Sequence, residues 1–532
     1  MALVELSGFL GANLKLNKRL LPPSVGVLSV NQKPSEEGDF RPWRSPLAIA
    51  TPPIGAARKT LYRMGRDTPD PAAYWLSWTT LVHVIRAFDA EDPTERTYFT
   101  GSGSPKWTDT TMAFSGTPYP NATRELAVPQ PTVPPTVMLD VDGESGDARQ
   151  LYYVYTWVND LGWESAPSPP FLAPAAKPGA TLNLAVGEAP PAGNYGITIV
   201  RWYRTQVVAG TTDAEYLFLR QYALGSVGMK DDARKLGEVL ASETWLPLPA
   251  NASWLTYCWN QFASALVDKS VRLCVPNYVY AWPIEHEYIL PAKPIAQAAF
   301  AQRLLVFTEA GAELFTGSDP GAMDQKPMTL ALIASQRSLV VGESWCIWAA
   351  KDGLWYYGVD GLRCLTGNSM STAQWAALQP TTIAGYLCKL GERTLYVGFY
   401  NDGALKGFVV DPANPDGIYF LSQGYAAGFW DPLLSALFVL DGSTVKQWDA
   451  GADFMTATFK SRVVRQVSHV EGEWVELVAD GGPCLVKVIT DQTTPFNRAV
   501  GTGEHRLPDG TGGREWQLEV QTATSVQGVV VE

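Results

Sequence analysis

Two Asp-Gly pairs lie eight residues apart in the segment WAAKDGLWYYGVDGL, residues 348–362. If Asp352 and Asp360 faced each other across a pocket at roughly 5–10 Å, they could act as the carboxylate pair of a glycosidase. Each aspartate is followed by glycine and stands between strand-like runs, and Asp-Gly in that setting is a strong hairpin signal. Turns at both ends of LWYYGV would separate the carboxylates by roughly 20 Å. The spacing therefore predicts two turns rather than a catalytic pair.

Other residue types that support chemistry are scattered. In EHE (285–287), a strand would place Glu285 and Glu287 on the face opposite His286, so the three could not share a metal ion. No nucleophile elbow or P-loop occurs, and GTGEHRLPDGTGG (501–513) does not stand between a strand and a helix, as a dinucleotide site requires. We predict no catalytic, cofactor-binding or metal-ligating residues, no cofactor, and a protein that is not an enzyme. Four histidines lie far apart in the sequence: His83, His286, His469 and His505.

One acidic stretch, DVDGESGD (140–147), could supply oxygen ligands to Ca²⁺ from Asp140, Asp142, Glu144 and Asp147. Its glycine does not stand where an EF-hand loop requires one, and a strand rather than a helix follows. The pattern favours an exposed acidic hairpin, and a bound Ca²⁺ remains the alternative.

The chain is acidic overall but basic at its start. It has 532 residues, 41 Lys and Arg against 53 Asp and Glu, and a net charge of −12, which disfavours a nonspecific grip on DNA phosphates. Residues 1–60 carry a net charge of +4, with eight basic and four acidic side chains. This segment is predicted either to dock on an acidic surface, such as a neighbouring subunit, or to form a solvated arm.

The six cysteines form no CxxC motif, and no secretory leader and no apolar run of transmembrane length are found. We therefore expect a soluble protein made in a reducing cytoplasm, with no membrane segment. Cys346, within the apolar WCIW, is expected to be a buried thiol.

Turn and strand signals divide the chain into four parts. Residues 1–125 read as an N-terminal arm and β-rich platform or propeller strands, and 126–250 as an inserted fibronectin III-like β-sandwich entered through the proline-rich LAVPQPTVPPTV. Residues 251–454 read as propeller-like repeats, and 455–532 as a small C-terminal β-sandwich. In that last part Lys460, Arg462 and Arg465 form a basic stretch, read as a solvated strand face or an interface.

The repeats carry the fold prediction. Strand, tight turn and strand recur around Gly311, Gly353, Gly403 and Gly442, which are 42, 50 and 39 residues apart. A period of about 40–45 residues is typical of four-stranded propeller blades. N-terminal strands are expected to complete the ring, one short helix is expected at MSTAQWAAL (370–378), and Trp345, Trp348 and Trp355 are expected in the core. The predicted class is all-β: a β-propeller-like body with an inserted fibronectin/Ig-like β-sandwich and a small C-terminal β-sandwich.

Several segments, in order, resemble a known family. They are GFLGANLKLNKRLLPPSVGVLSVNQKPSEEGDFRPWRSPL, TLYRMGRDTPDPAAYWLSW, ERTYFTGSGSPKW, YPNATRELAVPQPT, YTWVNDLGWESAPSPP and ELFTGSDPGAMDQ. Over most of residues 5–380 the chain resembles the tail nozzle, or tubular tail protein B, family of short-tailed bacteriophages and related prophages.

The resemblance implies a structural virion protein in the phage tail, assembled in the cytoplasm of the host bacterium. It implies a homohexameric ring at the distal end of the tail, docked to an adaptor ring and to tail fibres or a tip protein. Ejected DNA would pass through its channel without specific binding. Two alternatives stay open: a receptor- or glycan-binding tail protein on a β-propeller scaffold, and a glycan-degrading tail enzyme.

Overall fold

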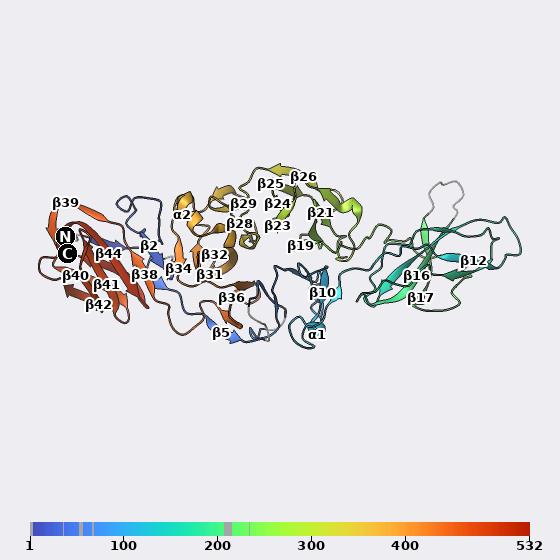
Figure 1. Cartoon of the computed structure of the whole chain (residues 1–532), viewed down its shortest axis with the longest axis horizontal. Helices are drawn as coiled ribbons and strands as arrows, with labels where there is room; N and C mark the ends of the chain where they lie inside the picture. The colour runs from blue at the N-terminus through green and yellow to red at the C-terminus, as the bar shows by residue number, and fades with distance from the viewer. Residues whose placement is uncertain (1–3, 36, 53–56, 66–68, 207–214, 234) are drawn as a thin grey trace. The chain divides into compact units, whose positions relative to one another are not determined.

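The computed structural model describes residues 4–35, 37–52, 57–65, 69–206, 215–233 and 235–532. The chain forms two compact units (Figure 1). The first contains Met1–Leu81, Leu305–Ala312 and Pro327–Glu532, and the second contains Val82–Leu304 and Glu313–Lys326. One boundary between the units lies between Leu81 and Val82, and the other three fall within β24 (Arg303–Thr308), β25 (Gly311–Thr316) and β26 (Asp324–Met328), which follow β23 (Pro294–Phe300).

The first unit contains successive antiparallel four-strand meanders, the arrangement of propeller blades. The third of these meanders is completed by a strand from the N-terminal region, β5 (Leu47–Ala50), which pairs with β37. The prediction of an all-β chain with propeller-like repeats is confirmed. The strands are β27 (Val340–Val341), β28 (Trp345–Ala349), β29 (Leu354–Gly358) and β30 (Gly361–Cys364); β31 (Ala384–Leu390), β32 (Arg393–Asn401), β33 (Leu405–Val410) and β34 (Tyr419–Leu421); and β35 (Ala427–Asp431), β36 (Ala436–Asp441) and β37 (Thr444–Gln447).

The predicted glycine turns occupy equivalent places in these meanders. Gly353, Gly403 and Gly442 each stand between the second and third strands, in the connections β28–β29, β32–β33 and β36–β37. Gly403 and Gly442 have φ of 115° and 61°, values that glycine adopts without steric cost. Gly311 begins β25, directly after the turn that follows β24. The repeat in the sequence is therefore a repeat of one hairpin.

The predicted short helix is also present, as α2 (Thr372–Ala377). The Ser371 side chain accepts a hydrogen bond from the backbone N–H of Gln374, and the Gln374 side chain accepts one from the backbone N–H of Ser371. This capping box fixes the start of the helix. Trp375 is buried and donates its indole N–H to the Ala350 carbonyl at 2.8 Å, which ties α2 to the neighbouring meander.

The C-terminal strands form two sheets around one apolar core. One sheet has the order β1-β45-β40-β43, and the other continues from β2 through β38-β44-β41-β42, with β39 also pairing with β44. The core includes Phe459, Trp516 and Val529, all buried. The strands are β38 (Ala457–Lys460), β39 (Val464–Glu471), β40 (Trp474–Asp480), β41 (Cys484–Thr490), β42 (Thr493–Val500), β43 (Gly503–Arg506), β44 (Gly512–Thr522) and β45 (Ser525–Val531).

The N-terminal region supplies strands to these same sheets. β1 (Val4–Ser7) pairs with β45, and β2 (Leu28–Val30) lies between β34 and β38, so that one ten-stranded sheet joins a propeller-like meander to the C-terminal strands (Figure 1). Phe9 and Phe40 pack on Phe459, with ring centroids 4.9 and 6.0 Å from it. Shorter pairs are β3 (Gln32–Lys33) with β4 (Arg41–Pro42) and β6 (Thr60–Arg63) with β7 (Trp75–Trp78).

The second unit contains two further antiparallel sheets of four strands each, with the orders β11-β10-β9-β8 and β19-β20-β21-β22. A short helix, α1 (Thr110–Ala113), is capped by the Asp109 carboxylate. The strands are β8 (His83–Arg86), β9 (Thr97–Thr100), β10 (Lys106–Thr108) and β11 (Arg124–Glu125); and β19 (Ser253–Tyr257), β20 (Ala263–Val267), β21 (Ser270–Leu273) and β22 (Glu287–Ile289).

Between β11 and β19 the chain forms the inserted fibronectin/Ig-like β-sandwich. Its sheets have the orders β12-β15-β18 and β14-β13-β16-β17. Tyr153 on β13 donates its hydroxyl to Asp231 on β18 at 2.7 Å, which links the two sheets. The predicted turn at 159–162 is present, since the N–H of Gly162 donates to the Asn159 carbonyl. The strands are β12 (Thr136–Val141), β13 (Tyr152–Asn159), β14 (Phe171–Leu172), β15 (Thr181–Ala185), β16 (Ile197–Thr205), β17 (Tyr216–Ala223) and β18 (Lys230–Asp231).

One sequence expectation was wrong. Residues 284–286 form a 3₁₀ turn, η1 (Ile284–His286), and only Glu287 begins a strand. Pro283 precedes the turn and cannot donate a ladder hydrogen bond, which favours a strand that starts later. Two other 3₁₀ turns are η2 (Gln336–Ser338) and η3 (Pro380–Thr382).

A close backbone approach at Gly417 gives a test of the N-terminal packing. A Cβ at this position would lie 1.8 Å from the carbonyl oxygen of Leu10, next to the paired residues Ala12 and Ile418. We expect Gly417→Ala to lower the free energy of unfolding by about 1–3 kcal/mol or more, because the backbone must move apart. Urea denaturation measures the change. Gly482→Ala is the matched control, since a Cβ there meets no atom within 4 Å, and an equal effect of both substitutions would contradict the packing.

A buried ion pair fixes the β6–β7 hairpin within the first unit. The Arg63 guanidinium donates to Asp431 at 2.7 Å and to the Asp70 carbonyl at 2.8 Å, and both charged side chains have no exposed surface. We expect Arg63→Met to lower the free energy of unfolding by about 3–5 kcal/mol, because the Asp431 charge stays buried without its partner.

The double variant Arg63→Met/Asp431→Leu should be more stable than the sum of the two single changes predicts. Additive losses in the same urea titrations would show that the two side chains are not energetically coupled.

Candidate functional site

The structure separates Asp352 and Asp360, as the hairpin interpretation predicted. The two stand at opposite ends of β29. Asp352 accepts the indole N–H of Trp355 at 2.9 Å, and Asp360 accepts the hydroxyl of Tyr356 at 2.8 Å and the guanidinium of Arg363 at 2.5 Å. The Tyr356 hydrogen bond holds the pKa of the Asp360 carboxyl below its usual range. Both carboxylates thus stabilise the ends of one strand.

The tryptophans and the cysteine of the same region were expected to be buried, and only some of them are. Trp348 and Cys346 are fully buried, and burial raises the pKa of the Cys346 thiol. Trp345 and Trp355 are half-buried. Both half-buried tryptophans stand near the start of their strands, Trp345 as the first residue of β28 and Trp355 as the second of β29, whereas the positions that follow are buried.

The acidic stretch 140–147 is engaged by the chain itself. Asp140 forms an ion pair with Lys230 at 2.8 Å, and the Asp142 carboxylate accepts the backbone N–H groups of Lys177 and Gly143 at 2.8 Å each. These backbone hydrogen bonds, that of Lys177 first, lower the pKa of the Asp142 carboxyl. Within the described ranges, no group of three or more His, Cys, Asp or Glu side chains could hold a metal ion.

The basic N-terminal segment finds acidic partners within its own chain. Arg19 pairs with Glu515, and Lys33 pairs with Asp449. The Arg44 guanidinium donates to the carbonyls of Gly451 and Ala452. The acidic surface predicted for this segment is therefore supplied, at least at these positions, by the C-terminal half of the same chain.

The predicted basic stretch of the C-terminal part is paired in a similar way. Lys460 lies 3.5 Å from Glu519, and Arg462 donates to the carbonyl of Leu21 at 3.3 Å. Two of the three cations are therefore engaged within the chain, and the choice between a solvated strand face and an interface stays a prediction.

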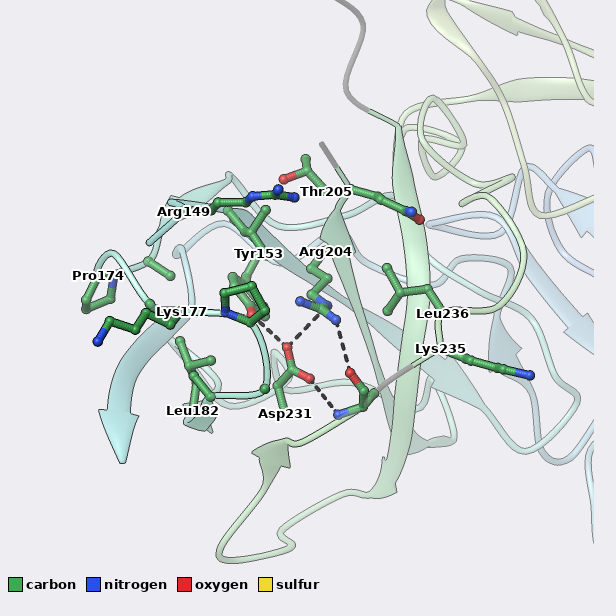
Figure 2. Close-up of a pocket in the computed structure, with 18 residues that line it drawn as sticks. Arg149, Tyr153, Pro174, Lys177, Leu182, Arg204, Thr205, Asp231, Lys235 and Leu236 are labelled. Atoms are coloured by element: carbon green, nitrogen blue, oxygen red, sulfur yellow. Dashed lines mark hydrogen bonds and ion pairs between the residues drawn. The ribbon is translucent and has the colours of Figure 1, made fainter. Parts of the chain in front are cut away.

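The inserted sandwich contains an open pocket that none of these sequence motifs indicated. Its volume is about 640 Å³, and it lies where the two sheets separate, between the start of β13, the end of β16 and the segments that flank β15 and β18. Figure 2 shows Tyr153, Arg204 and Asp231 meeting at one wall. Pockets of this size are typical of small-ligand sites.

A hydrogen-bonded cluster forms that wall. One Asp231 oxygen accepts the Tyr153 hydroxyl at 2.7 Å and lies 3.2 Å from Nε of Arg204, and the other accepts the N–H of Ala233 at 3.1 Å. The Arg204 guanidinium also donates from Nη2 to the Ala233 carbonyl at 3.3 Å. Burial, assisted by the Asp231 charge, raises the pKa of Tyr153. Its hydroxyl therefore stays a hydrogen-bond donor at neutral pH.

The pocket is basic although the chain is acidic. Arg149, Lys177, Arg204 and Lys235 line it, and Asp231 is its one lining carboxylate among the described residues. In Figure 2 the side chains of Lys177 and Lys235 extend outward on opposite sides, away from Arg204 and Asp231. These residues come from segments up to 86 positions apart (149 to 235), with no shared motif, so no local sequence signal could have grouped them.

Comparisons with known proteins give no family. No protein-family model matches the chain, and no curated protein matches it. Among solved structures it is similar to the Pan2 WD40 domain of Neurospora crassa (8% identity, 53% of this chain and 86% of that chain, TM-score 0.27) and to apo AztD from Citrobacter koseri (12%, 68% and 99%, 0.26). The AfRom2 CNH domain matches at 9% identity, over 73% of this chain and 98% of that one, with a TM-score of 0.25. At these scores the similarities support no argument about function.

No helix within the described residues is long and apolar enough to cross a membrane.

His83, a half-buried residue with a buried ring nitrogen, makes the second unit sensitive to acid. His83 stacks on Trp254 with ring centroids 3.8 Å apart, its Nδ1 is buried without a hydrogen-bond partner among the described residues, and burial lowers its pKa from 6.5 to about 3. The unfolded chain therefore takes up a proton at a higher pH than the folded chain. Stability should be complete above pH 6.5 and fall as the pH drops toward 3, by up to about 1.4 kcal/mol per pH unit.

Calorimetric melting between pH 7.5 and 5.5 measures this effect, and His83→Phe should flatten the dependence while keeping a stacked ring. His505→Gln, at a residue outside the core, is the control and should leave the dependence unchanged. An unaltered pH profile in His83→Phe would contradict the assignment.

Proposed function

We propose that the protein is a structural virion protein, the tail nozzle of a short-tailed phage or related prophage. The observation that carries the proposal is the placement of the family-like segments. TLYRMGRDTPDPAAYWLSW begins with β6 and ends with β7, ERTYFTGSGSPKW contains β9 and β10, and ELFTGSDPGAMDQ runs from β25 into β26. YTWVNDLGWESAPSPP includes the end of β13 and the turn after it. Three of the segments that resemble the family thus coincide with strand pairs, and a fourth coincides with a strand end and its turn.

The surface of the C-terminal sandwich suits assembly with partner proteins. Trp474 and Val478 are 41% and 40% exposed on one face of β40, and, on the other sheet, Val467 of β39 is completely exposed. Apolar side chains grouped on a strand face are often covered in an assembly. In a homohexameric ring, or against an adaptor ring, fibre or tip protein, this face would be buried.

The charge distribution suits a conduit for DNA. The net charge is −12, and several cations of the N-terminal segment are paired within the chain. An acidic channel wall would let DNA slide, whereas a basic wall would hold its phosphates. A hexamer map with a continuous Lys- and Arg-lined channel would contradict this part of the proposal.

A receptor- or glycan-binding tail protein is the second candidate, and the pocket of the inserted sandwich favours it. Binding of the purified protein to a glycan array would support this candidate. Release of reducing sugars from host surface polysaccharide would instead indicate a glycan-degrading enzyme.

Immunogold labelling tests the location in the virion. Antibodies against the purified chain, applied to tailed particles from the strain that encodes it, should label the distal end of the short tail and little else. The reason is that a nozzle closes the tail tube at the end where DNA leaves. Labelling of the capsid or of fibres alone, or intact tails without label, would contradict the nozzle proposal.

Antibodies absorbed with the purified chain are the control for nonspecific label. Electron microscopy of the purified protein adds an independent measurement, in which rings of six copies support the proposal.

A further inference from the structure

The pocket of the inserted sandwich is positively charged, whereas the chain as a whole is negatively charged. The chain as a whole has a net charge of −12, yet the charged residues among the described lining of the pocket sum to +3, from four cations and one carboxylate. A cavity lined by one sign of charge raises the local concentration of ligands of the opposite sign. The pocket is therefore suited to an anion.

Asp231, the carboxylate in the described lining, is occupied by partners within the protein. Both oxygens of Asp231 are engaged, one by the Tyr153 hydroxyl and Arg204 and the other by the Ala233 N–H. Only 3% of the Asp231 side chain is exposed. Its function is to hold Arg204 in place, because a buried carboxylate paired in this way fixes the guanidinium that it contacts.

Arg204 retains donor capacity toward the pocket. Of its guanidinium nitrogens, Nε faces Asp231 and Nη2 donates to the Ala233 carbonyl, while Nη1 donates to none of the described residues. A planar guanidinium with a fixed orientation suits a carboxylate or a phosphate, because it can present parallel N–H groups to two oxygens.

Three further cations line the pocket, and the Lys177 charge also acts on Asp142. The side chains of Arg149, Lys177 and Lys235 form no ion pair or hydrogen bond with other described residues, and Figure 2 shows Arg149 across the pocket from Asp231. Leu151 and Leu182 add apolar surface to the lining. The combination of one fixed guanidinium, three further cations and an apolar wall matches a small organic anion or a phosphate ester.

We propose that this pocket binds a small ligand through an anionic group, a carboxylate or a phosphate, with Arg204 as the fixed contact and Arg149 as the second. The site lies wholly within the inserted sandwich and does not depend on the location of the protein in a virion. An acidic saccharide and a phosphorylated polymer of a bacterial surface share this chemistry.

Isothermal titration calorimetry on the full chain at low ionic strength tests the site. The probes are inorganic phosphate, glucuronate and glucose. Phosphate, glucuronate or both should bind, glucose should not, and added salt should weaken binding. Binding of phosphate alone assigns a phosphate group, and binding of glucuronate alone assigns a carboxylate. The absence of binding by both anions at millimolar concentration would overturn the proposal.

Arg149→Gln should weaken anion binding about tenfold, the loss that corresponds to one charge-assisted hydrogen bond. Arg220→Gln is the matched control, because Arg220 has a 43% exposed side chain on β17, pairs with Asp232 and does not line the pocket. Both variants lose one positive charge from the same sandwich. Equal weakening by the two, or no change in Arg149→Gln, would show that the anion does not occupy this pocket and would overturn the proposal.

Discussion

Strand β2 forms hydrogen-bonded pairs along both of its edges, in parallel with β34 at Val30 and antiparallel to β38 from Leu28 to Val30. Three residues from the start of the chain therefore join a propeller-like meander to the C-terminal sheets. β1 and β5 have the same role, since each completes a sheet whose other strands lie more than 370 residues later in the sequence. The first unit cannot satisfy the edges of three sheets until residues 4–50 are in place, because unpaired strand edges cost hydrogen bonds and invite association.

Side chains reinforce this backbone pairing. Arg19 and Lys33 meet Glu515 and Asp449, so the charge asymmetry between the ends of the sequence becomes attraction within the fold. Exposed pairs of this kind contribute little each, about 0–1 kcal/mol. The larger contribution comes from burial, since Phe9 and Phe40 enter the core around Phe459. Electrostatics thus favours the correct docking of the N-terminal segment, and apolar packing stabilises it.

Local signals made the hairpins and one helix predictable. Asp-Gly turns at 352–353 and 360–361 bracket β29, and Ser371 with Gln374 caps α2, because turn and cap geometry depends on residues within four positions. The strand expected at 285–287 begins only at Glu287. Pro283 delays the start of β22, and this effect outweighs the alternating pattern. The partners of β1 and β2 were beyond prediction, since pairing over hundreds of residues is decided by tertiary packing and leaves no local pattern. The domain boundaries near residues 125, 250 and 454, and the prediction that the protein is not an enzyme, stay predictions.

The pocket was missed for a related reason, and this bears on where function can lie in the chain. Its wall depends on a buried cluster, Tyr153, Arg204 and Asp231, whose members come from three strands and both sheets of the sandwich. A sandwich held only by packing needs no buried carboxylate, and a buried carboxylate costs several kcal/mol unless it is fully hydrogen-bonded. Here that cost is offset by three partners, and the result is a guanidinium held in a fixed orientation beside an open cavity. Because the cluster lies inside the insertion, substitutions at the mouth of the pocket can change ligand binding without touching the strands β1, β2 and β5 that close the first unit.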